Sequence, residues 1–171
     1  GGGPIVNIIV TDGGSGYTAN GTVSLSGGGG SSGAANAQAN STGRIAAVNI
    51  TNNGSSYETN PTVTISAPTG QSFNGLTAVS NTNDTIALAG AGTLAVDDKV
   101  TYANAAGNTG IIGLTDGTQY FVSFANATHV ALAATQSGAN IDLTATVSET
   151  GHTLTGETAT AEAVVGGATN K

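Results

Sequence analysis

Residues 45–66, IAAVNITNNGSSYETNPTVTIS, repeat residues 5–26, IVNIIVTDGGSGYTANGTVSLS, at a fixed offset of forty positions. The two copies align without a gap and are identical at nine of twenty-two positions. Repeats of this size are typical of proteins in which one supersecondary unit is built more than once and packs on its neighbour. The sequence therefore predicts one structural unit built twice. The identical pairs are Ile5/Ile45, Thr11/Thr51, Gly14/Gly54, Ser15/Ser55, Tyr17/Tyr57, Asn20/Asn60, Thr22/Thr62, Val23/Val63 and Ser26/Ser66.

Each copy has the pattern of two strands joined by a turn. In the second copy, residues 62–65 alternate polar and apolar side chains with the period of two of a half-buried strand. Asn53-Gly54 is a hairpin marker because both residues accept a positive φ, and Asp12-Gly13-Gly14 occupies the same place in the first copy. We therefore predict a β-hairpin in each copy.

A third strand is predicted from the alternation of alanine with polar residues at 35–39, after the glycine-rich connection 27–33. The second copy lacks such a strand after Ser66, but the same alternation returns at 158–163, with residues 159–163 as the counterpart of 35–39. The simplest interpretation is that residues 71–157 are a separate module inserted into the second copy, at a loop tip where insertions are best tolerated. The body would then comprise residues 1–70 plus 158–171, as units 5–44 and 45–70 with 158–171.

The inserted stretch has a strand pattern of its own and no helical periodicity. Its short strands, separated by turn residues such as Asp116-Gly117, are typical of a small β-sandwich or barrel. The predicted fold class is therefore all-β: repeated β-hairpin or three-strand units with an inserted small β-sandwich or barrel module. The predicted strands of the module lie near 78–79, 85–88, 98–102, 119–124, 129–133, 141–143 and 152–154.

Composition excludes several function classes. Charged residues make up 8% of the 171-residue chain, the net charge is −7, and the basic residues number three. So few cations cannot neutralise nucleic-acid phosphates, and no apolar run approaches the length of a membrane-spanning helix, so we expect neither nucleic-acid binding nor membrane insertion. The chain has no cysteine, hence no disulfide or thiolate metal site. Because it begins Gly1-Gly2-Gly3-Pro4 without a methionine, we expect a fragment or a processed product.

No motif of the sequence points to catalysis. His129 and His152 are the only imidazoles, each in a strand-like run, and no H-x-H or H-E-x-x-H spacing supports a metal site. Serine, threonine and aspartate are abundant, but no G-x-S-x-G motif accompanies them. We therefore predict no enzyme activity, no catalytic residue, no metal and no cofactor.

The acids are interpreted as solvated turn residues. Asp84, Asp97 and Asp98 raise the alternative of a structural calcium, but their spacing does not fit the EF-hand loop and the GGSGYT motif lacks the aspartate of the calcium-binding β-roll. A glycosidase would need two carboxyl groups about 5–10 Å apart across a cleft. The sequence does not place the candidate acids relative to one another; these are Asp116, Asp142, Glu149 and Glu157.

Tyr17 and Tyr57 follow the predicted turn at the same place in each copy. An aromatic ring at that position can cover the turn while its hydroxyl stays in water. The functional alternative is a surface-binding platform for carbohydrate. We favour the structural role and keep Tyr17 and Tyr57 as the candidate surface-binding residues.

Residues 95–145 resemble a repeat module of large phage structural proteins, particularly of cyanobacterial and marine phages, and of giant bacterial surface adhesins. The resemblance covers a D-x-V-x-Y strand (Asp98, Val100, Tyr102) and the blocks GLTDGTQYFV at 113–122, LAAT at 132–135 and IDLT at 141–144. The paired GSGYT and PTVTI elements of the repeat resemble units of tail-fibre and virion proteins of such phages. No catalytic residue is implied by either resemblance.

The resemblance implies a non-catalytic virion structural protein: a phage head decoration, head fibre or tail-fibre segment that acts in assembly, stabilisation or surface attachment. A secreted bacterial adhesin or extracellular filament subunit is the alternative, and a carbohydrate-active enzyme is the third class. The expected location is the virion, or the cell surface for an adhesin. Because the chain has few charges to block its strand edges, we expect a homo-oligomer whose partners are its own copies, other virion or surface proteins and cell-surface glycan.

Overall fold

The structure is a computed structural model that describes residues 1–167. It contains two compact units, one formed by residues 1–67 with the segment that begins at Thr158, the other by residues 68–157. The sequence analysis expected these boundaries at 70/71 and 157/158; residues 168–171 of the expected body lie outside the described residues. Strands account for almost all regular structure, with a single short 3₁₀ helix, η1 (Ala91–Thr93), among the described residues. The all-β prediction is therefore confirmed. In the described part of the chain, no helix has the length and apolar character needed to span a membrane.

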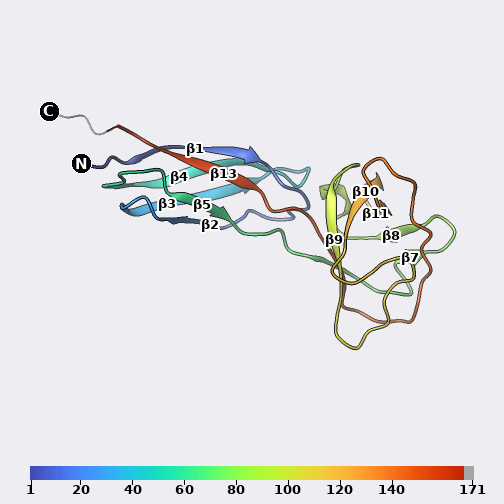
Figure 1. The fold of residues 1–171 in the computed structure, drawn as a ribbon. Helices are drawn as coiled ribbons and strands as arrows, with labels where there is room; N and C mark the ends of the chain where they lie inside the picture. Colours follow the sequence, from blue (N-terminus) through green and yellow to red (C-terminus); the bar gives the residue numbers. More distant parts are fainter. Residues whose placement is uncertain (168–171) are drawn as a thin grey trace. The chain divides into compact units, whose positions relative to one another are not determined.

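The body, as we call the first unit, contains six antiparallel strands. They form a four-stranded sheet in the order β1-β13-β5-β2 and a two-stranded sheet β3-β4, which a bridge between Thr22 and Asn36 joins at β2 and β3. Figure 1 shows β13, from the end of the chain, beside β1, from its beginning. The strands are β1 (Ile5–Asp12), β2 (Val23–Ser26), β3 (Ser31–Ala39), β4 (Ile45–Ser55), β5 (Thr62–Ile65) and β13 (Thr160–Val165).

The predicted hairpin within each copy is wrong. β4 runs through Asn53 and Gly54 to Ser55 and pairs with β3, not with β5. Gly54 does adopt the left-handed φ of +60° that Asn-Gly favours, but there it bends the end of a strand and does not close a hairpin. The actual hairpin of this region joins β3 to β4 through the turn at Asn40–Arg44.

The two copies exchange their third strands. β3 follows β2 in the first copy but pairs with β4, the first strand of the second copy; β13, the third strand of the second copy, pairs with β1 of the first. The registers are equivalent: Ala37 lies opposite Val48 as Ala163 lies opposite Ile8, and both ladders have bulges at corresponding places. The body is therefore a pseudo-twofold structure in which each copy completes the sheet of the other.

This register corrects the alignment of the alanine strands. The sequence analysis equated residues 35–39 with 159–163, whereas the pairing equates 33–39 with 159–165, a shift of two residues. The alternation has a period of two, so the pairing still places Ala35 on Ala161 and Ala37 on Ala163. β13 nevertheless lies in one sheet with β5, through the pair Glu162 and Thr62, as expected if the strand completes the second copy.

The core of the body follows the same symmetry. Ile5 and Ile45, Ile8 and Val48, and Tyr17 and Tyr57 are buried at equivalent positions, since each pair is separated by forty residues. Small side chains of the exchanged strands fill the space between them, because alanine lets neighbouring backbones approach closely. The buried alanines are Ala35, Ala37, Ala159, Ala161 and Ala163.

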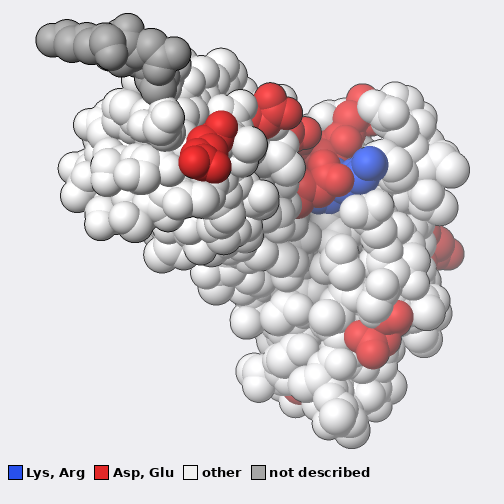
Figure 2. Space-filling model, turned by 60° about the vertical axis from the view of Figure 1, so that its left-hand side comes forward, with Lys and Arg blue, Asp and Glu red and all other residues white. Residues whose placement is uncertain are grey.

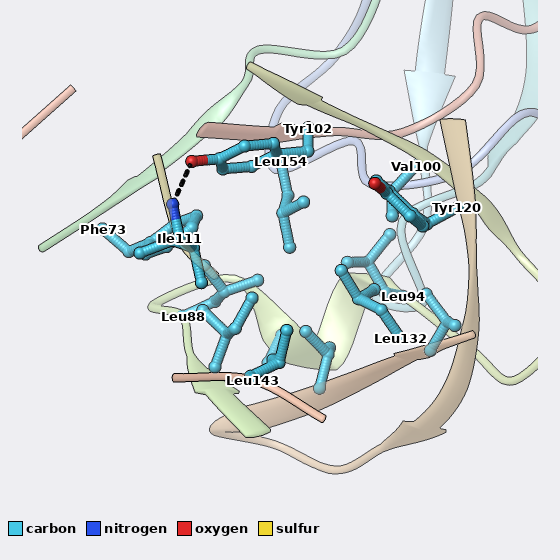
Figure 3. Close-up of a cluster of buried hydrophobic side chains, with 14 of the residues drawn as sticks. Phe73, Leu88, Leu94, Val100, Tyr102, Ile111, Tyr120, Leu132, Leu143 and Leu154 are labelled. Carbon is cyan, nitrogen blue, oxygen red and sulfur yellow. Dashed lines mark hydrogen bonds between the residues drawn. The ribbon is translucent and has the colours of Figure 1, made fainter. Parts of the chain in front are cut away.

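The inserted module, residues 68–157, is one seven-stranded antiparallel sheet in the order β6-β12-β9-β10-β11-β8-β7, curled around its own core. Figure 3 shows this core, in which Tyr102, Leu132, Leu143 and Leu154 are almost fully buried. The strands are β6 (Gln71–Phe73), β7 (Val79–Ser80), β8 (Thr85–Ala87), β9 (Lys99–Asn104), β10 (Gln119–Ala125), β11 (His129–Ala133) and β12 (His152–Thr155).

Two strand predictions in the module need correction. Residues 141–143 are not a strand: the Asp84 carboxylate accepts the N–H of Leu143 at 3.1 Å, and Ile141 donates to the Leu132 carbonyl at 2.8 Å, so these bonds hold the segment without a ladder. β6 was missed because its sequence, Gln71-Ser72-Phe73, carries only one apolar residue. It pairs with β12 at the edge of the sheet.

The symmetry of the body predicts how the module can be removed. Ser26 and Ser31, the ends of the tetraglycine turn 27–30, correspond to Ser66 and Glu157. Replacing residues 67–156 by four glycines should therefore leave a folded body with β-type circular dichroism and dispersed amide resonances, because the second loop would match the first. A shortened chain that is unfolded would show that the body depends on the module.

Candidate functional site

Tyr17 and Tyr57, the candidate surface-binding residues, are 3% and 4% exposed. A carbohydrate platform needs an accessible ring face, so the surface-binding interpretation is wrong for both. Their hydroxyls do not stay in water either: each accepts a backbone N–H at the start of an exchanged strand, from Ala159 to Tyr17 at 2.9 Å and from Gly33 to Tyr57 at 3.1 Å. The structural role favoured from sequence is the one these contacts support.

Tyr17 makes one contact more than its counterpart. Its hydroxyl donates to the carbonyl of Ser66 at 2.8 Å while it accepts the N–H of Ala159. Burial raises the pKa of Tyr17, an effect that the Ala159 N–H only partly offsets, and the hydroxyl keeps the proton that it donates. Ser66 and Ala159 belong to the two segments between which the module is inserted. One phenol therefore ties together the ends of the body at the insertion point.

His152 is fully buried between aromatic rings. It stacks on Phe73 and Tyr102 with ring centroids 5.5 and 6.1 Å away, and its Nδ1 lies 2.9 Å from the Tyr102 hydroxyl. The same hydroxyl accepts the N–H of Ile111 at 3.1 Å (Figure 3), so one phenol oxygen contacts both His152 and the backbone. Burial lowers the pKa of His152 and so favours the neutral ring. The negative charge of Glu149 raises this pKa by a smaller amount. His152 is thus a core residue.

The acids of the module hold its loops. Asp97 accepts the N–H and hydroxyl of Ser137, and Asp98 accepts the N–H of Ala95 at 2.7 Å. Asp84, Asp116 and Glu149 accept the N–H groups of Leu143, Asn104 and Thr109. Within residues 1–167, no three histidine or acidic side chains are grouped so that they could hold a metal ion. These contacts support the turn-acid interpretation over the calcium site.

The candidate site is an open hollow on the module, which we call the Phe124 hollow. Its volume is about 480 Å³, and strands β7, β8, β10 and β11 and the turns beside them supply its walls. Phe124 is its aromatic element and is 43% exposed. The hollow is lined by Ser80, Asn83, Thr85, Phe124, Asn126, His129 and Asn140.

A β-bulge turns Phe124 outward. Along β10, Tyr120 and Val122 point into the core, and strict alternation would bury Phe124 as well. Between Val122 and Phe124 the pairing with β11 slips by one residue, at Ser123, so Phe124 lies opposite Ala131 and faces solvent. Bulges of this kind re-aim side chains next to functional sites. Phe124 could not be identified from the sequence, because a bulge does not change the alternation of residue types by which a strand is recognised.

The hollow is lined by neutral polar side chains, by Phe124 and by one imidazole, that of His129. Of the residues that the structure describes, no Lys, Arg, Asp or Glu lines it. Figure 2 shows that charged side chains are few and scattered over one face of the molecule. His129, the second histidine of the sequence analysis, lines the hollow, with its Nδ1 2.8 Å from the hydroxyl of Thr128. The structure therefore places His129 at a surface hollow and His152 in the core.

Two other hollows lie on the body. One is lined by glycines at the two ends of the described chain together with residues 57–60 and Val165, and the other by residues 60–63 and residues 161–163 of β13. Neither includes an exposed aromatic ring.

Comparisons with family models, with curated proteins and with solved structures gave no match. The Phe124 hollow is the candidate site on its geometry alone.

The symmetry of the body supplies a matched pair of variants for the tyrosine contacts. Tyr17→Phe should lower the free energy of unfolding of the body by about 2–4 kcal/mol, because the buried Ala159 N–H and the part-buried Ser66 carbonyl both lose their partner. Tyr57→Phe should cost about 1–2 kcal/mol, because only the Gly33 N–H is left without an acceptor. Amide hydrogen exchange of β13 and β3 measures both effects. Equal losses in the two variants would contradict the bridging role of Tyr17.

Proposed function

We propose that this chain is a non-catalytic structural protein of a virion, a head decoration, head fibre or tail-fibre segment, with a role in surface attachment. The observation that supports the proposal best is the architecture: a duplicated β body that carries a second β module in one of two equivalent loops. The body provides a rigid base that does not need the inserted residues for its symmetry, and the module provides a separate surface. A body for assembly and a separate module for contact suit a protein that is both built into a particle and exposed on its surface.

The attachment role draws on the Phe124 hollow. The bulge turns Phe124 outward, where its ring is 43% exposed among polar side chains, and an aromatic ring with polar neighbours suits a contact surface. The hollow lies wholly within the module, between Ser80 and Asn140. We infer that the module makes the external contact.

For the body we propose contact with further copies of the chain. Val6 and Ile9 of β1 are 53% and 50% exposed, whereas the equivalent positions of the second copy hold Ala46 and Asn49. The fold therefore does not require large apolar side chains at these places. Exposed apolar residues on one of two equivalent strands support self-association through β1.

The location of the protein tests the virion proposal. Mass spectrometry of purified phage particles should find the chain in many copies per particle, since decoration and fibre proteins are repeated. The control is the cell-surface fraction of the uninfected host, which should lack it. Detection on host cells and absence from purified particles would favour the adhesin alternative and remove the virion proposal.

Self-association is tested by giving β1 the residues of its counterpart. The double variant Val6→Ala and Ile9→Asn should fold like the parent chain, because β4 accommodates Ala46 and Asn49 at the same positions. Its association constant, measured by sedimentation velocity, should fall by about tenfold or more if these side chains are covered on assembly. A parent chain that stays monomeric at high concentration, or a variant that associates equally, would refute contact through β1.

A further inference from the structure

The Phe124 hollow combines one apolar face with several polar groups that have no partner in the protein. The side chains of Asn83 and Asn140 make no hydrogen bond with other described residues, and the amide nitrogen of Asn126 is free although its oxygen accepts three bonds from Thr128 and His129. Side-chain amides both donate and accept, so the rim offers paired donors and acceptors to a ligand.

The charge of the lining limits the ligand. An anionic ligand would find no Lys or Arg among the described lining residues, only the imidazole of His129, and a cationic ligand would find no carboxylate. Asp84, which lies between Asn83 and Thr85 in sequence, directs its carboxylate to the N–H of Leu143. The hollow therefore suits a neutral molecule with one apolar face and several hydroxyl groups.

We propose that the Phe124 hollow is a binding site for a neutral saccharide. The C–H face of a pyranose ring covers the ring of Phe124, whose π face carries negative partial charge, and the sugar hydroxyls exchange hydrogen bonds with Asn83, Asn126 and Asn140. The bulge belongs to the folded sheet, so the backbone that presents Phe124 is set before binding. This inference deepens the proposed attachment role by naming the class of molecule that the module contacts.

The test uses the full chain and a panel of neutral hexose and N-acetylhexosamine oligosaccharides, each with a sulfated, sialylated or uronic-acid counterpart. Binding is followed by two-dimensional amide NMR and by saturation transfer to the sugar. We expect at least one neutral oligosaccharide to bind, with shifts centred on β8, β10 and β11, and its acidic counterpart to bind more weakly.

Three variants make the test specific. Phe124→Ala should weaken binding by about tenfold or more, and Asn83→Ala with Asn140→Ala should weaken it without unfolding the module, because these side chains hold no other part of the protein. Val96→Ala is the matched control, since Val96 is 54% exposed on the same module but does not line the hollow. Amide spectra of each variant establish that it is folded.

Several outcomes would overturn the saccharide site. These are no binding of any neutral oligosaccharide up to about 10 mM, equal binding by Phe124→Ala, equal loss in Val96→Ala, or preference for the acidic counterparts. None of these results bears on whether the chain is found in purified particles. The saccharide site and the virion proposal can therefore fail separately.

Discussion

The reciprocal exchange of β3 and β13 is the constraint on which the body depends. Neither copy of the repeat owns a complete sheet, because β1 needs β13 and β4 needs β3. After the inserted module, the chain must therefore return to the body at Thr158 to supply β13. The Tyr17 hydroxyl stabilises this return. It donates to the carbonyl of Ser66, before the module, and accepts the N–H of Ala159, after it. Loop-closure entropy grows only slowly with loop length, so that a module of 90 residues in place of four glycines is tolerated.

A chain with so few charges holds its loops by hydrogen bonds that backbone N–H groups donate to side-chain oxygens. Asn20 accepts the N–H of Ala39 and Asn60 that of Val165, which are equivalent contacts in the two copies and explain why both asparagines are retained. In the module, carboxylates accept backbone N–H groups in the same way. Bonds of this kind fix turns without ion pairs, which are weak at the surface in any case. The loops beside the Phe124 hollow share this feature through Asn126.

What the sequence could and could not predict follows from what each pattern encodes. The repeat predicts two copies of one unit. The second segment of alternating alanines predicts the strand that completes the second copy, and its distance from Ser66 indicates an insertion there. Pairing partners are not encoded in a period of two. Asn53-Gly54 reports a positive φ and is satisfied by a bend at the end of β4 as well as by a hairpin, and only the three-dimensional exchange decides between them. Phe124 was beyond reach for the same reason, because a one-residue bulge reverses the face of a strand without changing its composition.

The two equivalent loops of the body support the proposal that the external contact lies in the module. A change within β1, β3, β4 or β13 alters a ladder that both copies share, and the symmetric core leaves little room for it. The connection between β5 and β13 is free of that restriction, since its counterpart between β2 and β3 needs only four glycines. A second domain placed there can vary its own surface while Tyr17 keeps the ends of the body together. The Phe124 hollow, built by a bulge in a sheet that the body does not share, shows the kind of local feature that this arrangement permits.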